Sequence, residues 1–271
     1  MRNAQEALTG PAAIAASFAR ARAEQRAALI TYLTAGYPSQ KESPALFRAL
    51  EQGGADILEM GVPFSDPIAD GPTIQRASYA ALQKGVTPSA CLNLVRRLRQ
   101  EGLRLPIILM GYYNPIYRYG LTAYAKACRE SGVDGLIVPD VPVEEAEPLQ
   151  AACRACDLAL ILLAAPTTRE ERLRRIAEET EGFLYLVARL GITGAGHGLA
   201  EDLRERIALA RRLARVPVAV GFGIATPEQA RALAAWADGV IVGSAVVERA
   251  PQGPEALAQY IAGLRAALRP A

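Results

Sequence analysis

The sequence predicts a single (β/α)8 barrel, and three observations lead to this fold class. Short apolar runs typical of strands alternate with amphipathic helical stretches from end to end, which is the pattern of a parallel sheet. There are eight such runs, and their residues are apolar throughout, as expected where both faces of each strand are covered. One barrel domain over residues 1–271 also fits the length, because such barrels run to about 250 residues.

The predicted elements follow the chain in strict alternation. The strands are Ala28–Thr34, Asp56–Met60, Pro106–Met110, Gly135–Val138, Leu158–Ala164, Phe183–Ala188, Pro217–Val220 and Gly239–Val242. Three helices have clear starts, in which a cap residue precedes a proline: Ser43-Pro44, Thr87-Pro88 and Thr226-Pro227. An extra helix is expected before the first strand. Two helices, Thr73–Lys84 and Pro88–Gln100, are expected between the second and third strands.

A weak internal repeat supports one closed architecture. The segments GGADILEMG, SGVDGLIVPD and AWADGVIVGS each place an Asp just before a predicted buried strand. The alternative, an open doubly wound sheet, would need a G-x-G-x-x-G turn after the first strand. The chain has Ala35-Gly36-Tyr37-Pro38 there, so the barrel is favoured.

Composition excludes several classes of partner. The chain carries 30 Lys and Arg against 28 Asp and Glu, and its arginines are spread along the sequence, so nucleic acid is not expected to bind. The longest apolar runs, such as Leu158–Ala165, are about half of the roughly 20 residues that cross a bilayer. The N-terminal segment lacks a continuous apolar stretch of the kind found in signal peptides. We therefore expect a cytoplasmic protein without a membrane segment.

Cysteine, histidine and lysine place limits on the chemistry. Cys153 and Cys156 form a C-x-x-C, but they lie in a helical pattern without a partner pair and are interpreted as small apolar helix residues. His197 is the only histidine, so a site with several histidine ligands is impossible and no metal is predicted. The three lysines all lie outside the predicted strands, which disfavours a Schiff-base mechanism.

Two carboxylates are the candidates for acid–base chemistry. Glu59 lies inside an apolar strand, where burial would raise its pKa and suit it to proton transfer near neutral pH. The alternative is a structural Glu paired with an arginine. Asp70, in the following proline-rich loop, is the natural second carboxylate, although an Asp in a loop is often only a turn former.

A second group of residues is typical of phosphate binding. Glycine turns follow the sixth, seventh and eighth predicted strands, in the runs that contain Gly194, Gly223 and Gly243-Ser244. Such turns expose backbone N–H groups, and barrels often bind anions after strands seven and eight. A single glycine turn is weak evidence, but three in barrel register are more specific. With walls such as Tyr32, Tyr112 and Phe222, the set suits a sugar phosphate joined to a flat apolar group that acts as its own electron sink.

Seven segments, in order and spacing, resemble the tryptophan synthase alpha chain family. They are ITYLTAGYP, LEMGVPFSDPIADGPTIQ, ILMGYYNPIY, GLIVPDVP, RLGITG, VGFGI and VIVGSAVV. The resemblance covers nearly the whole chain, and the VPFSDPIADGPTIQ run is its most specific part. It implies a TIM barrel lyase that cleaves indole-3-glycerol phosphate to indole and glyceraldehyde 3-phosphate.

The resemblance also implies a role for each matched residue. Glu59 would protonate indole C3 and take the proton from the glycerol hydroxyl, while Asp70 would bind the indole N–H. Gly194, Gly223, Gly243 and Ser244 would hold the phosphate. The indole pocket would consist of Tyr32, Met110, Tyr112, Ile137 and Phe222, and Arg189 and Thr193 would belong to a lid.

A partner is implied as well. The family passes indole to a beta subunit, and we expect an alpha2beta2 tetramer, no cofactor in this chain and pyridoxal phosphate in the beta partner. Pro63, Asp66, Asn114 and Tyr117 are candidates for the docking face. Two alternatives stay open, namely a stand-alone indole-releasing lyase and a binding subunit that mainly activates its partner.

Overall fold

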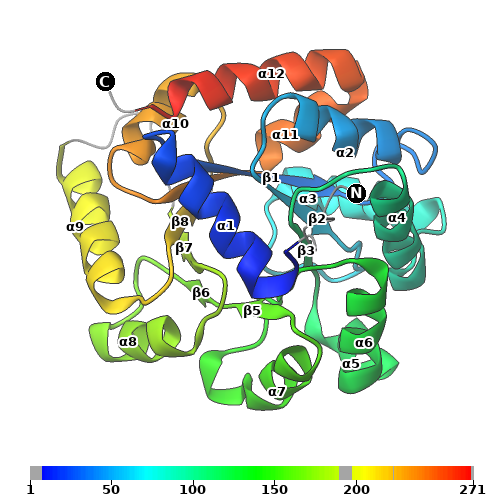
Figure 1. Ribbon diagram of the computed structural model, residues 1–271, viewed down its shortest axis with the longest axis horizontal. Helices are drawn as coiled ribbons and strands as arrows, with labels where there is room; N and C mark the ends of the chain where they lie inside the picture. The colour runs from blue at the N-terminus through cyan, green and yellow to red at the C-terminus, as the bar shows by residue number, and fades with distance from the viewer. Residues whose placement is uncertain (1–7, 189–196, 222, 270–271) are drawn as a thin grey trace, which may run out of the picture.

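The computed structural model describes residues 8–188, 197–221 and 223–269 and shows a parallel barrel surrounded by helices (Figure 1). The sheet order is β5-β4-β3-β2-β1-β9-β8-β7-β6, and every pairing is parallel. The strands are β1 Ala28–Thr34, β2 Ile57–Gly61, β3 Ile107–Met110, β4 Gly135–Ile137, β5 Ala159–Ile161, β6 Leu163–Ala164, β7 Leu184–Val187, β8 Val218–Gly221 and β9 Gly239–Val242. The predicted barrel is confirmed.

The predicted fifth strand, Leu158–Ala164, is in fact two short strands. Strand β5 pairs with β4 and β6 pairs with β7, with Leu162 between them. The Leu162 amide donates to the Thr180 hydroxyl oxygen at 2.9 Å, and its carbonyl accepts from the Tyr185 amide at 3.1 Å. At the point where the barrel closes, the Thr180 side chain therefore accepts the Leu162 amide that a neighbouring strand would otherwise accept.

The helices confirm both predicted additions to the barrel. Helix α1 precedes β1, and α3 and α4 both lie between β2 and β3. A second pair, α5 and α6, between β3 and β4 was not predicted. The helices described are α1 Gly10–Ala23, α2 Ser43–Gln52, α3 Pro72–Gln83, α4 Pro88–Gln100, α5 Tyr113–Tyr119, α6 Leu121–Ser131, α7 Glu147–Ala155, α8 Glu170–Glu179, α9 His197–Leu213, α10 Pro227–Ala234, α11 Ser244–Arg249 and α12 Pro254–Ala267, with 3-10 turns at η1 Val143–Glu145 and η2 Ala250–Gln252.

Two of the three predicted helix caps are confirmed. The Thr87 hydroxyl accepts from the Ala90 amide at 3.2 Å, and Thr226 forms a reciprocal capping box with Gln229. The third prediction was wrong, because Ser43 is itself the first residue of α2. Its hydroxyl instead accepts from the Gly36 amide at 3.1 Å and so holds the turn after β1.

Apolar side chains fill the barrel interior and the layer between strands and helices. Alternate strand residues, such as Ile30, Ile57 and Ile108, form the interior cluster. Helix α1 crosses the N-terminal end of the barrel (Figure 1) and adds Ile14 and Phe18 to that cluster. Because α1 covers this end, the site is expected at the opposite end, where the C-terminal ends of the strands lie. No helix in the described ranges combines the length and the apolar stretch that a bilayer crossing requires.

The repeated Asp before a strand has the same structural role at all three positions. Asp56, Asp134 and Asp238 each accept the amide of the first or second residue of the preceding strand, at 2.8, 2.9 and 2.9 Å. Each also accepts from an arginine placed before that strand, respectively Arg26, Arg99 and Arg211. At each of the three sites the Asp carboxylate accepts a backbone amide near the start of a strand, which would otherwise be buried without a partner. The sequence repeat therefore reflects a repeated structural contact.

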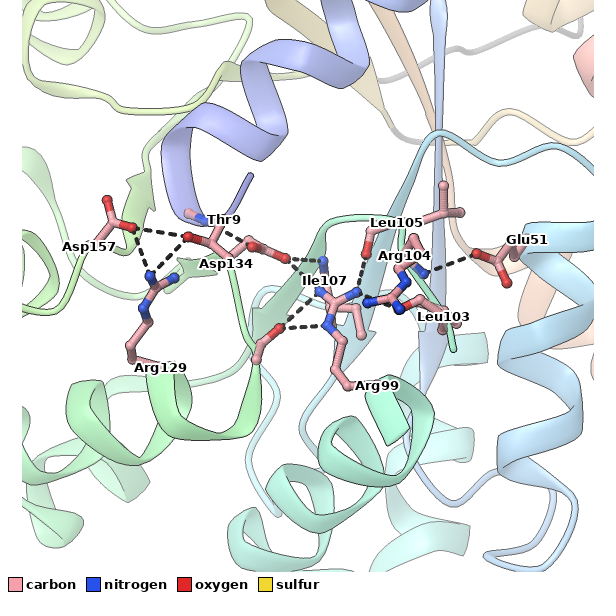
Figure 2. Close-up of polar contacts among 12 residues, drawn as sticks. Thr9, Glu51, Arg99, Leu103, Arg104, Leu105, Ile107, Arg129, Asp134 and Asp157 are labelled. Atoms are coloured by element: carbon pink, nitrogen blue, oxygen red, sulfur yellow. Dashed lines mark hydrogen bonds and ion pairs between the residues drawn. The ribbon is translucent and has the colours of Figure 1, made fainter. Parts of the chain in front are cut away.

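The Asp134 site also fastens α1 to the barrel (Figure 2). Asp134 Oδ1 accepts the Gly10 amide at 2.8 Å, and Oδ2 accepts from Ile107 and Arg99. Arg99 donates further to the carbonyl oxygens of Gly132 and Leu105. These bonds tie the start of α1, the end of α4 and the starts of β3 and β4 into one network.

Candidate active site

One cavity of about 420 Å³ opens at the C-terminal end of the barrel. Its wall comes from strand ends and from the loops that follow them, the place where barrels of this type build their sites. The sequence-predicted residues Tyr32, Glu59, Met110, Asp70, Gly223, Gly243 and Ser244 all line it. The predicted constellation is therefore gathered around one space.

Glu59 is the buried acid of this cavity. It lies on β2 two residues after Ile57, so both side chains are on the interior face of the strand, and Glu59 is 1% exposed. Its Oε2 makes no hydrogen bond to the described part of the chain. Burial, and then the nearby Asp70 carboxylate, raise its pKa to about 8. Among the described residues, Glu59 forms no ion pair with an arginine.

Asp70 is held above the cavity by a tyrosine. The Tyr112 hydroxyl donates to Asp70 Oδ2 at 3.0 Å and accepts from the Ala69 amide at 3.0 Å. Burial raises the pKa of Asp70 to about 6, and the hydrogen bond from Tyr112 opposes that rise. The pKa of Glu59 is higher than that of Asp70 because Glu59 is more deeply buried and lies near the Asp70 carboxylate, whereas Asp70 accepts a hydrogen bond from Tyr112.

The predicted phosphate residues lie on neighbouring turns of the cavity wall. Gly223 follows β8 with φ +79°, a conformation that favours glycine, and a Cβ there would meet no atom of the described part of the chain within 4 Å. Gly243 and Ser244 follow β9, and Ser244 is the first residue of α11. Gly194 lies outside the described residues.

The predicted indole walls divide into two groups. Tyr32 and Met110 line the cavity. Ile137 is fully buried in the interior cluster on which Met110 packs, and Tyr112 stands behind Asp70, so neither is among the lining residues described. Phe222 and the lid residues Arg189 and Thr193 lie outside the described part of the chain.

The sequence analysis missed several lining residues, of which Tyr185 and Arg172 are the most notable. Tyr185 lies on β7 two residues after the buried Phe183, and that period of two was the available signal. Burial, and then Glu59, raise the pKa of Tyr185. Arg172 on α8 makes a bidentate ion pair with Glu144 at 2.9 and 3.0 Å. Nothing local in the sequence connects those two residues.

Acidic, cysteine and histidine side chains do not form a metal-binding group of three or more within the described ranges. The four cysteines are free thiols. The helical interpretation is confirmed for Cys153, which is buried on α7, whereas Cys156 caps the end of that helix and is half-buried.

Comparison with known proteins identifies the family. Residues 18–269 match the tryptophan synthase alpha chain family. The chain belongs to this family. It is 47% identical to the tryptophan synthase alpha chain of Dehalococcoides mccartyi over 247 residues, which cover 90% of this chain and 96% of the relative. It is 50% identical to that of Gloeobacter violaceus over 242 residues, covering 89% and 87%.

A solved structure agrees. Mycobacterium tuberculosis tryptophan synthase superposes with a TM-score of 0.87 at 40% identity, over 95% of this chain and 98% of that one. As a tryptophan synthase alpha chain, the protein is a lyase that cleaves indole-3-glycerol phosphate to indole and glyceraldehyde 3-phosphate. Membership also implies a beta-subunit partner.

Proposed function

We propose that Glu59 and Asp70 perform the cleavage as an acid and an ionised acceptor with separate roles. With a pKa of about 8, Glu59 is mostly protonated at neutral pH and can donate to C3 of the indole ring. With a pKa of about 6, Asp70 is mostly ionised and can accept the indole N–H as positive charge develops on the nitrogen. This pairing of pKa values across one cavity is the observation that carries the proposal.

The same two groups balance the reaction. Once C3 is protonated, the Glu59 carboxylate takes the proton from the glycerol hydroxyl next to the ring. That oxygen becomes the aldehyde carbonyl as the carbon–carbon bond to C3 breaks. The bonding electrons return to the ring, whose nitrogen had accepted the positive charge. Glu59 ends protonated, ready for the next turnover.

The rest of the cavity would bind the substrate's two ends. Backbone N–H groups at Gly223 and Gly243, with Ser244, would hold the phosphate, together with Gly194. Tyr32 and Met110 would contact the indole directly, with Tyr112 and Ile137 behind them and Phe222 completing the wall. Arg189 and Thr193 would close over the site.

We further propose that residues 1–271 form one domain and that the chain works in the cytoplasm within an alpha2beta2 tetramer. Pyridoxal phosphate would belong to the beta partner, which would receive the indole. Of the docking candidates, Asp66, Asn114 and Tyr117 are exposed near the cavity mouth, whereas Pro63 is buried and would act only through the shape of its loop.

The direct test is indole release from indole-3-glycerol phosphate by the wild type, Glu59→Gln and Asp70→Asn. Both variants keep side-chain size, so each should remain folded and lose at least about 100-fold in kcat. Undiminished indole release by either folded variant would remove that residue from the mechanism.

A further inference from the structure

Tyr260, on α12 outside the barrel, contacts two of the three segments that carry the proposed phosphate residues, those of Gly223 and of Gly243-Ser244. Its hydroxyl donates to the Ala225 carbonyl at 3.0 Å, and Ala225 lies two residues after Gly223. The face of its ring packs on the Arg249 guanidinium, whose central carbon is 3.9 Å from the ring centroid. Arg249 is the last residue of α11, the helix that Ser244 begins. One side chain therefore joins the turn after β8 to the helix after β9.

The turn at Gly223 depends on such outside contacts. Gly223 is exposed, and no atom of the described residues lies within 4 Å of the position that its Cβ would take. Two residues later the backbone is firmly held, since the Ala225 amide donates to Gln229 Oε1 at 2.7 Å and the Ala225 carbonyl accepts from Tyr260. Gln229 is fixed in turn by the capping box of α10. Ala225 is thus the anchor of the turn, and Tyr260 supplies half of its hydrogen bonds.

Arg249 gives Tyr260 its own fixed position. The guanidinium donates to the Ala245 carbonyl at 3.3 Å, which keeps the side chain alongside α11. A cation held over an aromatic face is favourable, more so where both groups are partly buried. Arg249 therefore holds the Tyr260 ring against α11, the helix that Ser244 begins, while the Tyr260 hydroxyl donates to Ala225.

We propose that Tyr260 is a positioning residue for the phosphate subsite, fixing the Gly223 turn relative to Gly243 and Ser244. This inference rests on the proposed placement of the phosphate. Backbone donors bind an anion well only when they are already oriented, because reorientation on binding consumes part of the affinity. Loss of the Tyr260 hydroxyl should therefore weaken phosphate binding and leave the indole end and the proton transfer unaffected.

The experiment compares Tyr260→Phe with the wild type, using glycerol 3-phosphate as a probe of the phosphate end and indole as a probe of the other. Loss of the one neutral hydrogen bond from Tyr260 should weaken glycerol 3-phosphate binding by about three- to tenfold. It should raise KM for indole-3-glycerol phosphate by about the same factor. The affinity for indole and kcat should not change. Tyr79→Phe, at a 66% exposed tyrosine of α3, is the matched control and should behave as wild type.

Gly223→Ala, measured in parallel, distinguishes a failure of this inference from a failure of the proposed phosphate site. A positive φ makes that substitution strained, so it should weaken glycerol 3-phosphate binding if the phosphate sits at this turn. If Gly223→Ala weakens binding and Tyr260→Phe does not, the positioning role is wrong and the phosphate site stands. If neither variant weakens it, the phosphate lies elsewhere and both proposals fail. Equal weakening of indole and glycerol 3-phosphate in Tyr260→Phe would show a general structural role and overturn the inference.

Discussion

The hydroxyl of Tyr112 lies 3.0 Å from both Asp70 Oδ2 and the Ala69 amide nitrogen, so one side chain after β3 fastens the loop that carries the second carboxylate. Its ring also stacks on Phe64 of the same loop, with centroids 5.1 Å apart. The hydrogen bond favours the ionised form of Asp70 against the effect of burial. Tyr112 is therefore better described as a support for Asp70 than as a wall of the cavity.

Replacement of Tyr112 by Phe should move the acid limb of the kcat–pH profile to higher pH. Asp70 must be ionised to accept the indole N–H, so activity falls as pH drops through its pKa of about 6. Removing the donor raises that pKa further, and less of the enzyme is active at pH 6. Tyr113→Phe, which alters the next residue along the chain, should leave the limb in place. If the acid limb does not shift in Tyr112→Phe, either Asp70 is not the group that titrates in this limb or Tyr112 does not control the pKa of Asp70.

Glu59→Gln should become more stable while it loses activity. Glu59 has a pKa of about 8 in the fold against an ordinary value of 4.5, so between these pH values only the folded chain keeps the proton. The stability of the wild type therefore falls as pH rises through this window. The variant has no such loss, and urea unfolding at pH 8 should show a gain of roughly 4 kcal/mol that disappears below about pH 4.5. Glu178→Gln, at an exposed residue of α8, should show no gain. A destabilised Gln variant would instead indicate a structural role for Glu59.

Gly61→Ala should damage the site through Tyr32. A Cβ on Gly61 would lie 2.1 Å from the Tyr32 hydroxyl oxygen, closer than atoms can approach. Tyr32 is buried, with its hydroxyl 3.2 Å from that of Thr34, so it must leave this position and enter the cavity. We expect kcat/KM to fall at least about tenfold, as steady-state indole release would show. Gly263→Ala, with no atom within 4 Å of its Cβ, should retain full activity and gain slightly in stability from helix propensity.

Asp134→Asn should reduce stability without affecting catalysis. Both carboxylate oxygens accept from donors, so an Asn must turn its NH2 toward a backbone amide or toward Arg99. Leaving these buried groups unpaired should lower the free energy of unfolding by roughly 2–4 kcal/mol, as measured in urea. Asp157→Asn is the matched control, because its carboxylate is 57% exposed and its ion pair with Arg129 adds little. An equal effect of the two substitutions would contradict the role assigned to the network.

Addition of a beta subunit should accelerate indole release at least tenfold, equivalent to about 1.4 kcal/mol of barrier. Asp70 lies on a loop whose residues Ser65, Asp66 and Ile68 are exposed, and a partner that binds the closed loop would lower the ordering cost. The measurement is steady-state indole release at increasing beta-chain concentration. A rate that is high from the start and does not change, with no complex in the ultracentrifuge, would favour a stand-alone lyase.

Most of the fold was predictable because strand burial and helix starts are local signals. The apolar runs located every strand, and Thr87 and Thr226 marked true helix starts. Ser43 misled because its hydroxyl satisfies Gly36, a contact made by the fold and not by the helix. The break at Leu162 was hidden for a similar reason, since its partner Thr180 lies 18 residues away.

The site was predictable in part. An acidic residue inside an apolar strand is visible in any sequence, and Glu59 was found in that way. The support that Tyr112 gives Asp70 was not visible, because it depends on a loop folding back over the next strand. Arg172 on α8 and Glu144 in η1 meet although they are 28 residues apart, and Tyr260 reaches Ala225 from α12. Such pairs are set by the closure of the barrel, which local sequence patterns do not encode.

Strands β5 and β6 are the two ends of the sheet order, and at Leu162 they are joined through the chain itself and not by strand pairing. Several contacts hold the join in place of a regular ladder. The Thr180 hydroxyl accepts from Leu162 and donates to Phe183, the Leu162 carbonyl accepts from Tyr185, and Leu160 pairs with Glu181. Leu162 and Leu163 also face the cavity. Thr180 and Glu181 therefore support this part of the cavity wall from behind, and a substitution at either position would reshape the wall without replacing a residue that lines it. Directed evolution toward bulkier indoles should accordingly gather its substitutions around Thr180.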